Sequence, residues 1–395
     1  MLQKHSFQIF CIVMFIFVLM TSSVWINKFL PTTPTLIGGN LLMLVCLIPH
    51  SASLKIDTKC IWILALIICI GVWFTEIKGM VMGIYYVLCF LPSIFLYILP
   101  YQYKYYLLKF CTKWFSICIG IGLIIYFITL FISLPPLGIF IKENNDFYPP
   151  FSNYIFFIKP FYNLYQFRYN AFFLEPGHLA ISTIFFIAAN DFRITQNRYL
   201  QILVVGIIAS FSLAGYLLLV IGWCLLRMKH TKNFILIALA LSGTYLISQT
   251  WNSGNNLINE LIISRLELNE ETGIEGNNRT NDRTDSMFKN LLQSDTLLTG
   301  LPNAENLRIF GAGYKKYLLI NGLISAILIF SLYWLLKNSS CNRRYGIGLI
   351  ILVFLTWCDC EYLTWYTWIL PYTLGTGIHL SPKSLSDQSH ISITN

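Results

Sequence analysis

Charged residues are scarce in this sequence. Asp, Glu, Lys and Arg together make up 11% of its 395 residues, whereas an ordinary soluble domain carries roughly 25%. Apolar residues make up 56% of the chain and aromatic residues 16%. This composition excludes an ordinary soluble domain and indicates a chain that lies largely in lipid.

The sequence also lacks the common motifs for metals, nucleotides and disulfide frameworks. It has no array of Cys and His at zinc spacing, no glycine-rich phosphate loop and no D-x-D pair for a metal-bound nucleotide sugar. The eleven cysteines lie in or beside apolar runs, as small apolar residues of a helix bundle do. We therefore expect no metal, no cofactor and no disulfide framework outside the membrane.

Long apolar runs are abundant. A spanning helix needs about 20 mainly apolar residues, because the hydrocarbon core is roughly 30 Å thick and leaves no backbone polar group unpaired. We predict ten full spans, at residues 6–26, 33–49, 60–75, 79–99, 114–136, 171–190, 233–251, 314–336, 345–358 and 362–380.

The apolar run at residues 200–226 is longer than one span and shorter than two. Basic residues lie directly before and after it, so the positive-inside rule places both of its ends in the cytoplasm. The run is therefore expected to enter and return as two short helices. Ser210, Ser212 and Gly215 mark the predicted meeting point.

The resulting fold class is all-α, a polytopic membrane helix bundle of about twelve crossings, with residues 1–395 as one integral membrane domain. Two long periplasmic loops are predicted at residues 137–170 and 252–313, and a cytoplasmic tail at 381–395. This topology assigns 15 Lys and Arg to the cytoplasm and 12 to the outward side. The net charge of +9 follows from this inward bias, so no nucleic acid partner is implied.

A first cluster of ionisable residues lies at the outward membrane face, in the stretch from Gln166 to His178. Such residues are costly at membrane depth and are functional candidates. In a continuous helix, Arg168, Glu175 and His178 would share one face, with Arg168 and Glu175 roughly 10 Å apart along the axis. The alternative is structural: Arg168 anchors to lipid head groups, Glu175 caps a helix whose first turn holds Pro176, and His178 is a bundle residue.

A second cluster lies in the large loop, where Arg279 and Arg283 are four residues apart. Paired guanidinium groups suit a diphosphate, although these arginines could simply form ion pairs with Asp282 and Asp285. Four apolar residues that follow predict a short amphipathic helix: Met287, Phe288, Leu291 and Leu292. Three basic residues near the end of the loop could mark the membrane boundary: Arg308, Lys315 and Lys316.

These residues carry a family resemblance. The stretch from Arg168 to His178, with Phe173-x-Glu175-Pro176, resembles the signature of bacterial O-antigen and capsule repeat-unit polymerases, in the O-antigen polymerase and ligase superfamily. Two further segments are similar to that group, a Gly-x-Gly loop end followed by a helix start and the Ser-containing break of a paired short helix: Phe310-Gly-Ala-Gly313 with Leu318-Leu-Ile-Asn-Gly-Leu-Ile324, and Phe211-Ser-Leu-Ala-Gly-Tyr216.

The resemblance implies a GT-C-like membrane glycosyltransferase of the bacterial inner membrane that works at the periplasmic face. Its substrate would be undecaprenyl-diphosphate-linked oligosaccharide, and the growing glycan would move to the acceptor sugar hydroxyl of a new repeat unit. Glu175 would be the base, with His178 in reserve, and Arg168, Arg279 and Arg283 would face the diphosphate. Membrane lipids, a chain-length regulator and a flippase are the expected partners.

Two alternatives remain open at this point. Related ligases typically carry a His in the last large outward loop, and residues 252–313 contain none, which favours a polymerase over a ligase. A flippase or other transporter of the same lipid-linked units would also need many helices and basic residues. Transporters usually place charge near the bilayer midplane, whereas the arginines here concentrate in outward loops.

Overall fold

A computed structural model describes the greater part of the chain: residues 2–22, 32–141, 150–161, 167–227, 249–250, 268–269, 273–274, 282–302, 304, 307, 309 and 312–379. Within these residues the fold is mostly helical, with twelve α-helices: α1 (Leu2–Ser22), α3 (Thr32–Leu47), α4 (Thr58–Lys78), α5 (Met80–Ile98), α6 (Tyr101–Phe131), α7 (Pro176–Ala189), α8 (Arg198–Ala209), α9 (Leu213–Arg227), α11 (Asp282–Leu292), α12 (Gly313–Leu336), α13 (Arg343–Asp359) and α14 (Tyr366–Ile378). Three short 3-10 turns accompany them: η1 (Ile48–Ser53), η2 (Ile194–Gln196) and η6 (Asp295–Leu297).

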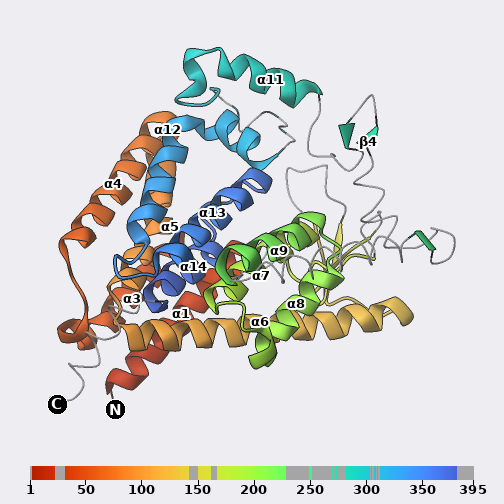
Figure 1. Ribbon diagram of the computed structural model, residues 1–395, viewed down its shortest axis with the longest axis horizontal. Helices are drawn as coiled ribbons and strands as arrows, with labels where there is room; N and C mark the ends of the chain where they lie inside the picture. The colour runs from red at the N-terminus through yellow and green to blue at the C-terminus, as the bar shows by residue number, and fades with distance from the viewer. Residues whose placement is uncertain are drawn as a thin grey trace.

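Five helical segments of the described residues are long and apolar enough to cross a membrane: Thr32–Ser53, Thr58–Lys78, Met80–Ile98, Tyr101–Phe131 and Gly313–Leu336. This confirms the prediction of a helical membrane protein. α6 is longer than expected, because it begins 13 residues before the predicted span at residue 114 and runs along the lower edge of the view in Figure 1. The predicted span at residues 233–251 lies outside the described residues except for 249–250.

The paired short helices are confirmed. α8 ends at Ala209 and α9 begins at Leu213, so the break lies at the predicted serines. Phe211 takes a left-handed φ of 46° there, and the Ser212 hydroxyl accepts a hydrogen bond from Gly215 N at 3.2 Å. Ser210 and Ser212 are buried, so the polar groups of the break face the bundle, as non-helical backbone at membrane depth requires.

One end of the bundle collects lysines, and we call it the basic end. It is defined by four residues at the ends of α4, α6 and α12 and in the connection before α4: Lys55, Lys59, Lys104 and Lys337. The start of α4 meets the end of α12 here, because the Lys59 ammonium donates to the Lys337 carbonyl at 2.5 Å. Nearby termini of other helices are joined by an ion pair of 3.4 Å between Arg227 and Asp191. The candidate functional site is separate from the basic end and lies where α7 and α12 begin.

The predicted loop at residues 137–170 holds a small antiparallel sheet, an addition to the all-helical expectation. Its strands are β1 (Gly138–Phe140), β2 (Phe151–Asn153) and β3 (Ile158–Pro160), in the order β1-β2-β3. The chain then returns to the bundle, where the Ile158 amide donates to the Ala171 carbonyl at 2.8 Å. Within the large loop, a second short pair is formed by β4 (Leu268–Asn269) and β5 (Gly273–Ile274).

α12 is broken at Gly322, where the backbone takes a φ of 74°. The end of the large loop crosses this break, since Ile324 N donates to the Leu298 carbonyl at 3.2 Å and Leu301 N to the Leu319 carbonyl at 2.8 Å. A Cβ on Gly322 would lie 2.3 Å from the Leu298 carbonyl oxygen. Glycine is therefore needed both for the positive φ and for the close backbone approach.

Candidate active site

The segment before α7 is not helical. Residues 167–175 form turns and bends, and α7 begins at Pro176 with Glu175 as its N-cap residue. Proline fixes its own φ, lacks an N–H donor and holds the preceding residue in extended conformation, so it suits the first position of a helix. The predicted common helix face of Arg168, Glu175 and His178 is therefore wrong for Arg168. The structural alternative was right that Glu175 caps α7, although its side chain makes no capping hydrogen bond.

Arg168 holds the loop against the break between α8 and α9. The residue is 7% exposed, and its Nε donates to the Ser210 carbonyl at 3.0 Å. The next residue repeats the contact, since Tyr169 N donates to the Ala209 carbonyl at 2.9 Å. The last carbonyls of a helix have no partner within the helix, and a cationic side chain satisfies them well. This contact gives Arg168 a positioning role at the end of α8.

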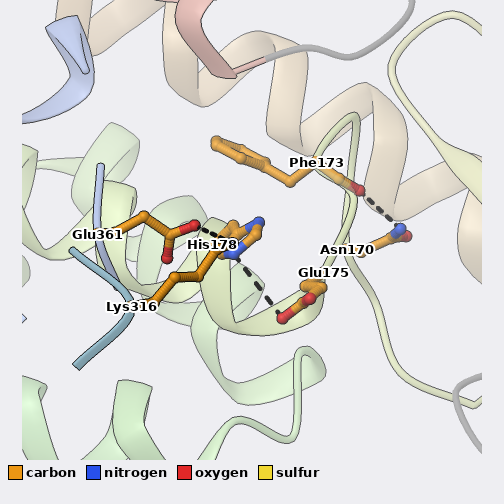
Figure 2. Close-up of polar contacts among 6 residues, drawn as sticks. All are labelled: Asn170, Phe173, Glu175, His178, Lys316 and Glu361. Carbon is orange, nitrogen blue, oxygen red and sulfur yellow. Dashed lines mark hydrogen bonds and ion pairs between the residues drawn. The ribbon is translucent and has the colours of Figure 1, made fainter. Parts of the chain in front are cut away.

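Glu175 and His178 lie together on the first turn of α7 (Figure 2). The distance between Glu175 Oε2 and His178 Nε2 is 3.7 Å, with the Glu175 side chain 34% exposed and the His178 side chain 8% exposed. The imidazole packs edge-on against Tyr362 and Trp365, at 5.2 and 5.3 Å between ring centroids. The imidazole is thereby held in place behind the more accessible carboxylate.

Lys316 and Glu361 complete the group. The Lys316 ammonium lies 2.5 Å from Glu361 Oε1, and both side chains are partly exposed. The Glu175 carboxylate also acts electrostatically on Lys316. Figure 2 shows this pair beside His178, although Lys316 comes from the first turn of α12 and Glu361 from the connection between α13 and α14. Three segments far apart in the sequence thus place four ionisable side chains together.

Sequence reasoning missed the importance of this pair. It treated Lys316 as a marker of the membrane boundary and did not single out Glu361. The available signal was an acidic residue in the short connection between two apolar runs, at a depth where an ionisable group is costly. The identity of its partner, 45 residues away, required the structure.

The predicted amphipathic helix in the large loop is confirmed as α11, which lies beside the first half of α12 (Figure 1). Leu291 is buried and Phe288 packs edge-on against Tyr314, whereas Leu292 is exposed, contrary to its predicted place on the apolar face. Two predicted ligands of the diphosphate have different outcomes: Arg283 lies exposed on α11, and Arg279 falls outside the described residues.

Asp285 has a different partner from the one considered in the sequence. The carboxylate of this α11 residue pairs with Lys315 at 2.7 Å instead of with an arginine of its own helix. Lys315 also lies over the Phe288 ring, 5.9 Å from its centroid. The contact fixes α11 to the start of α12, next to the residue that pairs with Glu361.

Comparison with protein-family models, with curated proteins and with solved structures gave no match for this chain. Among the described residues, no group of three or more His, Cys, Asp or Glu side chains is arranged to hold a metal ion. The ionisable residues at the beginning of α7 and α12 therefore form the candidate active site, where a carboxylate, an imidazole and an ammonium lie together.

Proposed function

We propose that this chain is an O-antigen polymerase, a membrane glycosyltransferase that joins undecaprenyl-diphosphate-linked oligosaccharide repeat units. The observation that carries the proposal is the group formed by Glu175, His178, Lys316 and Glu361 at the start of α7 and α12. Ionisable residues at such a position are costly and indicate a functional site. The resemblance of the Arg168 to His178 stretch to the polymerase signature supplies the reaction.

In the proposed reaction, Glu175 accepts the proton of the acceptor sugar hydroxyl. The hydroxyl oxygen then forms a bond to the anomeric carbon of the growing glycan, and the bond between this carbon and the diphosphate oxygen breaks. The electron pair of that bond leaves with undecaprenyl diphosphate. Glu175 suits the role of base because its carboxylate is accessible while the neighbouring His178 is packed in place.

The leaving diphosphate gains negative charge in the transition state, so cations aimed at it lower the barrier. Lys316 joins the predicted arginines in this role, because its ammonium lies close enough to the Glu175 carboxylate for the two charges to interact. The start of α7 contributes as well, since the positive end of the helix dipole favours an anion. Arg168 would act from its place at the end of α8, and Arg279 and Arg283 from the large loop.

The proposal includes a topology. Twelve crossings of the bacterial inner membrane, with a GT-C-like arrangement, would place the start of α7 and the large loop at the periplasmic face. The lysines of the basic end support this orientation, because short cytoplasmic connections carry an excess of Lys and Arg. Repeat units would then reach the site after a flippase has moved them outward.

A gene deletion separates the polymerase from its two alternatives. Loss of a polymerase leaves lipopolysaccharide that carries a single repeat unit, because the ligase still transfers unpolymerised units. Loss of a ligase or of a flippase leaves bare core. We expect the single-unit band on a gel of lipopolysaccharide from the deletion strain, with the long-chain ladder restored by the plasmid-borne gene. Bare core would reject the polymerase.

A further inference from the structure

The basic end contains a cavity of about 190 Å³. It lies where α4 and α6 begin, beside the connection between α12 and α13 and the end of α14. The residues that line it include hydrogen-bond donors: the ammonium groups of Lys55 and Lys104 and the hydroxyls of Ser339 and Ser340. The volume corresponds to roughly six water molecules at ~30 Å³ each.

Lys104 is the buried cation of this cavity, with 4% of its surface exposed. Its ammonium donates one hydrogen bond, to the Tyr97 carbonyl at 2.7 Å, and lies 5.4 Å from the centroid of the Tyr97 ring. Its stem is pressed against Gly377, where a Cβ would lie 2.7 Å from Lys104 Cδ. An ammonium has three donors, so two remain for a ligand in the cavity that Lys104 lines.

Positive charge exceeds negative charge among the residues that line the cavity. Asp57 is the single carboxylate among the described residues that line it, and it already accepts hydrogen bonds from Cys60 N at 3.1 Å and the Tyr97 hydroxyl at 3.0 Å. Lys55 and Lys104 oppose it. A buried charge is costly unless it is paired and hydrogen-bonded, and the excess favours an anion in the cavity.

Two neighbouring features add further positive charge or positive potential near the cavity. Lys59 donates to the Lys337 carbonyl at the end of α12, and its ammonium also lies 5.4 Å from the centroid of the Tyr97 ring that Lys104 contacts. α4 and α6 both begin at the cavity, and helix N-termini carry partial positive charge. The Lys59 and Lys104 ammonium groups are held by hydrogen bonds to carbonyl oxygens, so their charges are in place before any ligand binds.

We propose that this cavity binds a phosphoryl group, supplied by an anionic phospholipid head group or by free phosphate. A phosphoryl group has several acceptor oxygens for the Lys and Ser donors, and its negative charge balances the excess of lysines. Basic pockets between membrane helices are known to take anionic head groups on the cytoplasmic side. The site lies away from Glu175 and is independent of the glycosyl transfer.

Two arms of one experiment distinguish the sources of the phosphoryl group. In the first, the purified full chain in detergent is titrated with sodium phosphate, with sodium chloride at equal ionic strength as the blank, and the unfolding temperature is recorded. In the second, the chain is reconstituted in phosphatidylcholine vesicles with or without phosphatidylglycerol, and retained lipid is counted by native mass spectrometry. Saturation by phosphate alone identifies free phosphate; selective retention of phosphatidylglycerol identifies the lipid.

The variants assign the binding to the cavity. Lys104→Gln removes the buried cation, and we expect about tenfold weaker binding of the phosphoryl ligand, since hydrogen bonds to charged groups have that effect. Lys55→Gln, on the exposed connection before α4, gives a second variant that does not disturb the bundle. Lys109→Gln is the matched control, because it removes the same charge from an exposed position on α6. Binding of neither ligand, or equal weakening by Lys109→Gln, overturns the proposal.

Discussion

The two ends of the bundle hold their charges in different ways. At the start of α7 and α12, charges of opposite sign from separate segments meet, as in the pair between Lys316 and Glu361. At the basic end, Lys59 and Lys104 are held by carbonyl oxygens and by the face of Tyr97. Carboxylates neutralise cations, whereas carbonyls and aromatic rings only orient them. The first arrangement suits proton transfer to an accessible carboxylate, and the second leaves net positive charge for an external anion.

The largest expected effect is that of Glu175→Gln. It keeps the shape of the side chain and removes the base, so polymer formation should fall by about 100-fold or more, the range of general base catalysis. The ladder of long-chain lipopolysaccharide should disappear while the protein still inserts in the membrane. Glu76→Gln is the control, because it removes the same charge from an exposed position on α4. A normal ladder from Glu175→Gln would exclude this carboxylate as the base.

A large loss of stability is expected for Gly322→Ala, in the helix that links the two ends. Alanine would be strained at a φ of 74° and its Cβ would meet the Leu298 carbonyl, so the free energy of unfolding should fall by about 2–3 kcal/mol. Gly38→Ala is the control, since no atom lies within 4 Å of its added Cβ. Thermal unfolding in detergent would measure both. Equal stability of the two variants would contradict the observed crossing at the α12 break.

Variants of the ion pair between Lys316 and Glu361 test how strongly the opposite charges at the start of α12 depend on each other. Lys316→Met should lower the polymerisation rate by about tenfold, because a partly buried cation next to Glu175 is lost, and should cost about 1–3 kcal/mol of stability. Glu361→Gln should cost a similar amount of stability. The double variant should cost less than the sum of the two, since each single change leaves one charge without its partner. Additive losses would show that the two side chains do not interact.

Variants of Arg168 test whether one residue both stabilises the fold and takes part in the reaction. Arg168→Gln removes the bond from Nε to the Ser210 carbonyl, so about 1–2 kcal/mol of stability should be lost. If Arg168 also faces the diphosphate, activity falls more than the loss of folded protein explains. Arg168→Lys keeps the charge, and the ratio of rate to folded protein in the two variants separates the two roles.

The smallest expected effect is a pH dependence at the basic end. Partial burial raises the pKa of Asp57, but hydrogen bonds from Cys60 and Tyr97 outweigh it and lower the pKa below its usual range. A carboxylate with a lowered pKa adds stability above the unfolded pKa of ~3.9, and this is lost as the pH falls through the folded pKa. Asp57→Asn keeps a capping residue for α4. The two proteins should therefore differ in unfolding temperature at pH 7 and converge below about pH 4.

The sequence predicted the helices well because apolar runs of spanning length leave the backbone little choice in lipid. The break at Ser210 and Ser212 followed from the length of the apolar run and the basic residues on both sides of it. The helix observed at Asp282–Leu292 followed from the spacing of its apolar residues. The alternative in which Glu175 caps a helix that begins at Pro176 predicted the start of α7 correctly. The prediction of a continuous helix from Arg168 was wrong because proline disfavours a helical conformation for the residue before it.

The contacts across the bundle could not be predicted. Arg168 meets Ser210, and Lys316 meets Glu361, across 42 and 45 residues of sequence. A single sequence shows which residues are costly in a membrane but not which helix faces which, because several packings satisfy the same apolar pattern. The site thus changed from a row of residues on one helix to a junction of α7, α12 and the connection after α13.

The central claim is that Glu175 serves as the base of a glycosyl transfer between lipid-linked repeat units. It is tested most directly by reconstituting the purified protein in vesicles with undecaprenyl-diphosphate-linked repeat units and following the length of the lipid-linked glycan by gel. The wild-type chain and Glu76→Gln should form products longer than one repeat unit and release undecaprenyl diphosphate, while Glu175→Gln should form none. Longer products from Glu175→Gln at the wild-type rate would contradict the account.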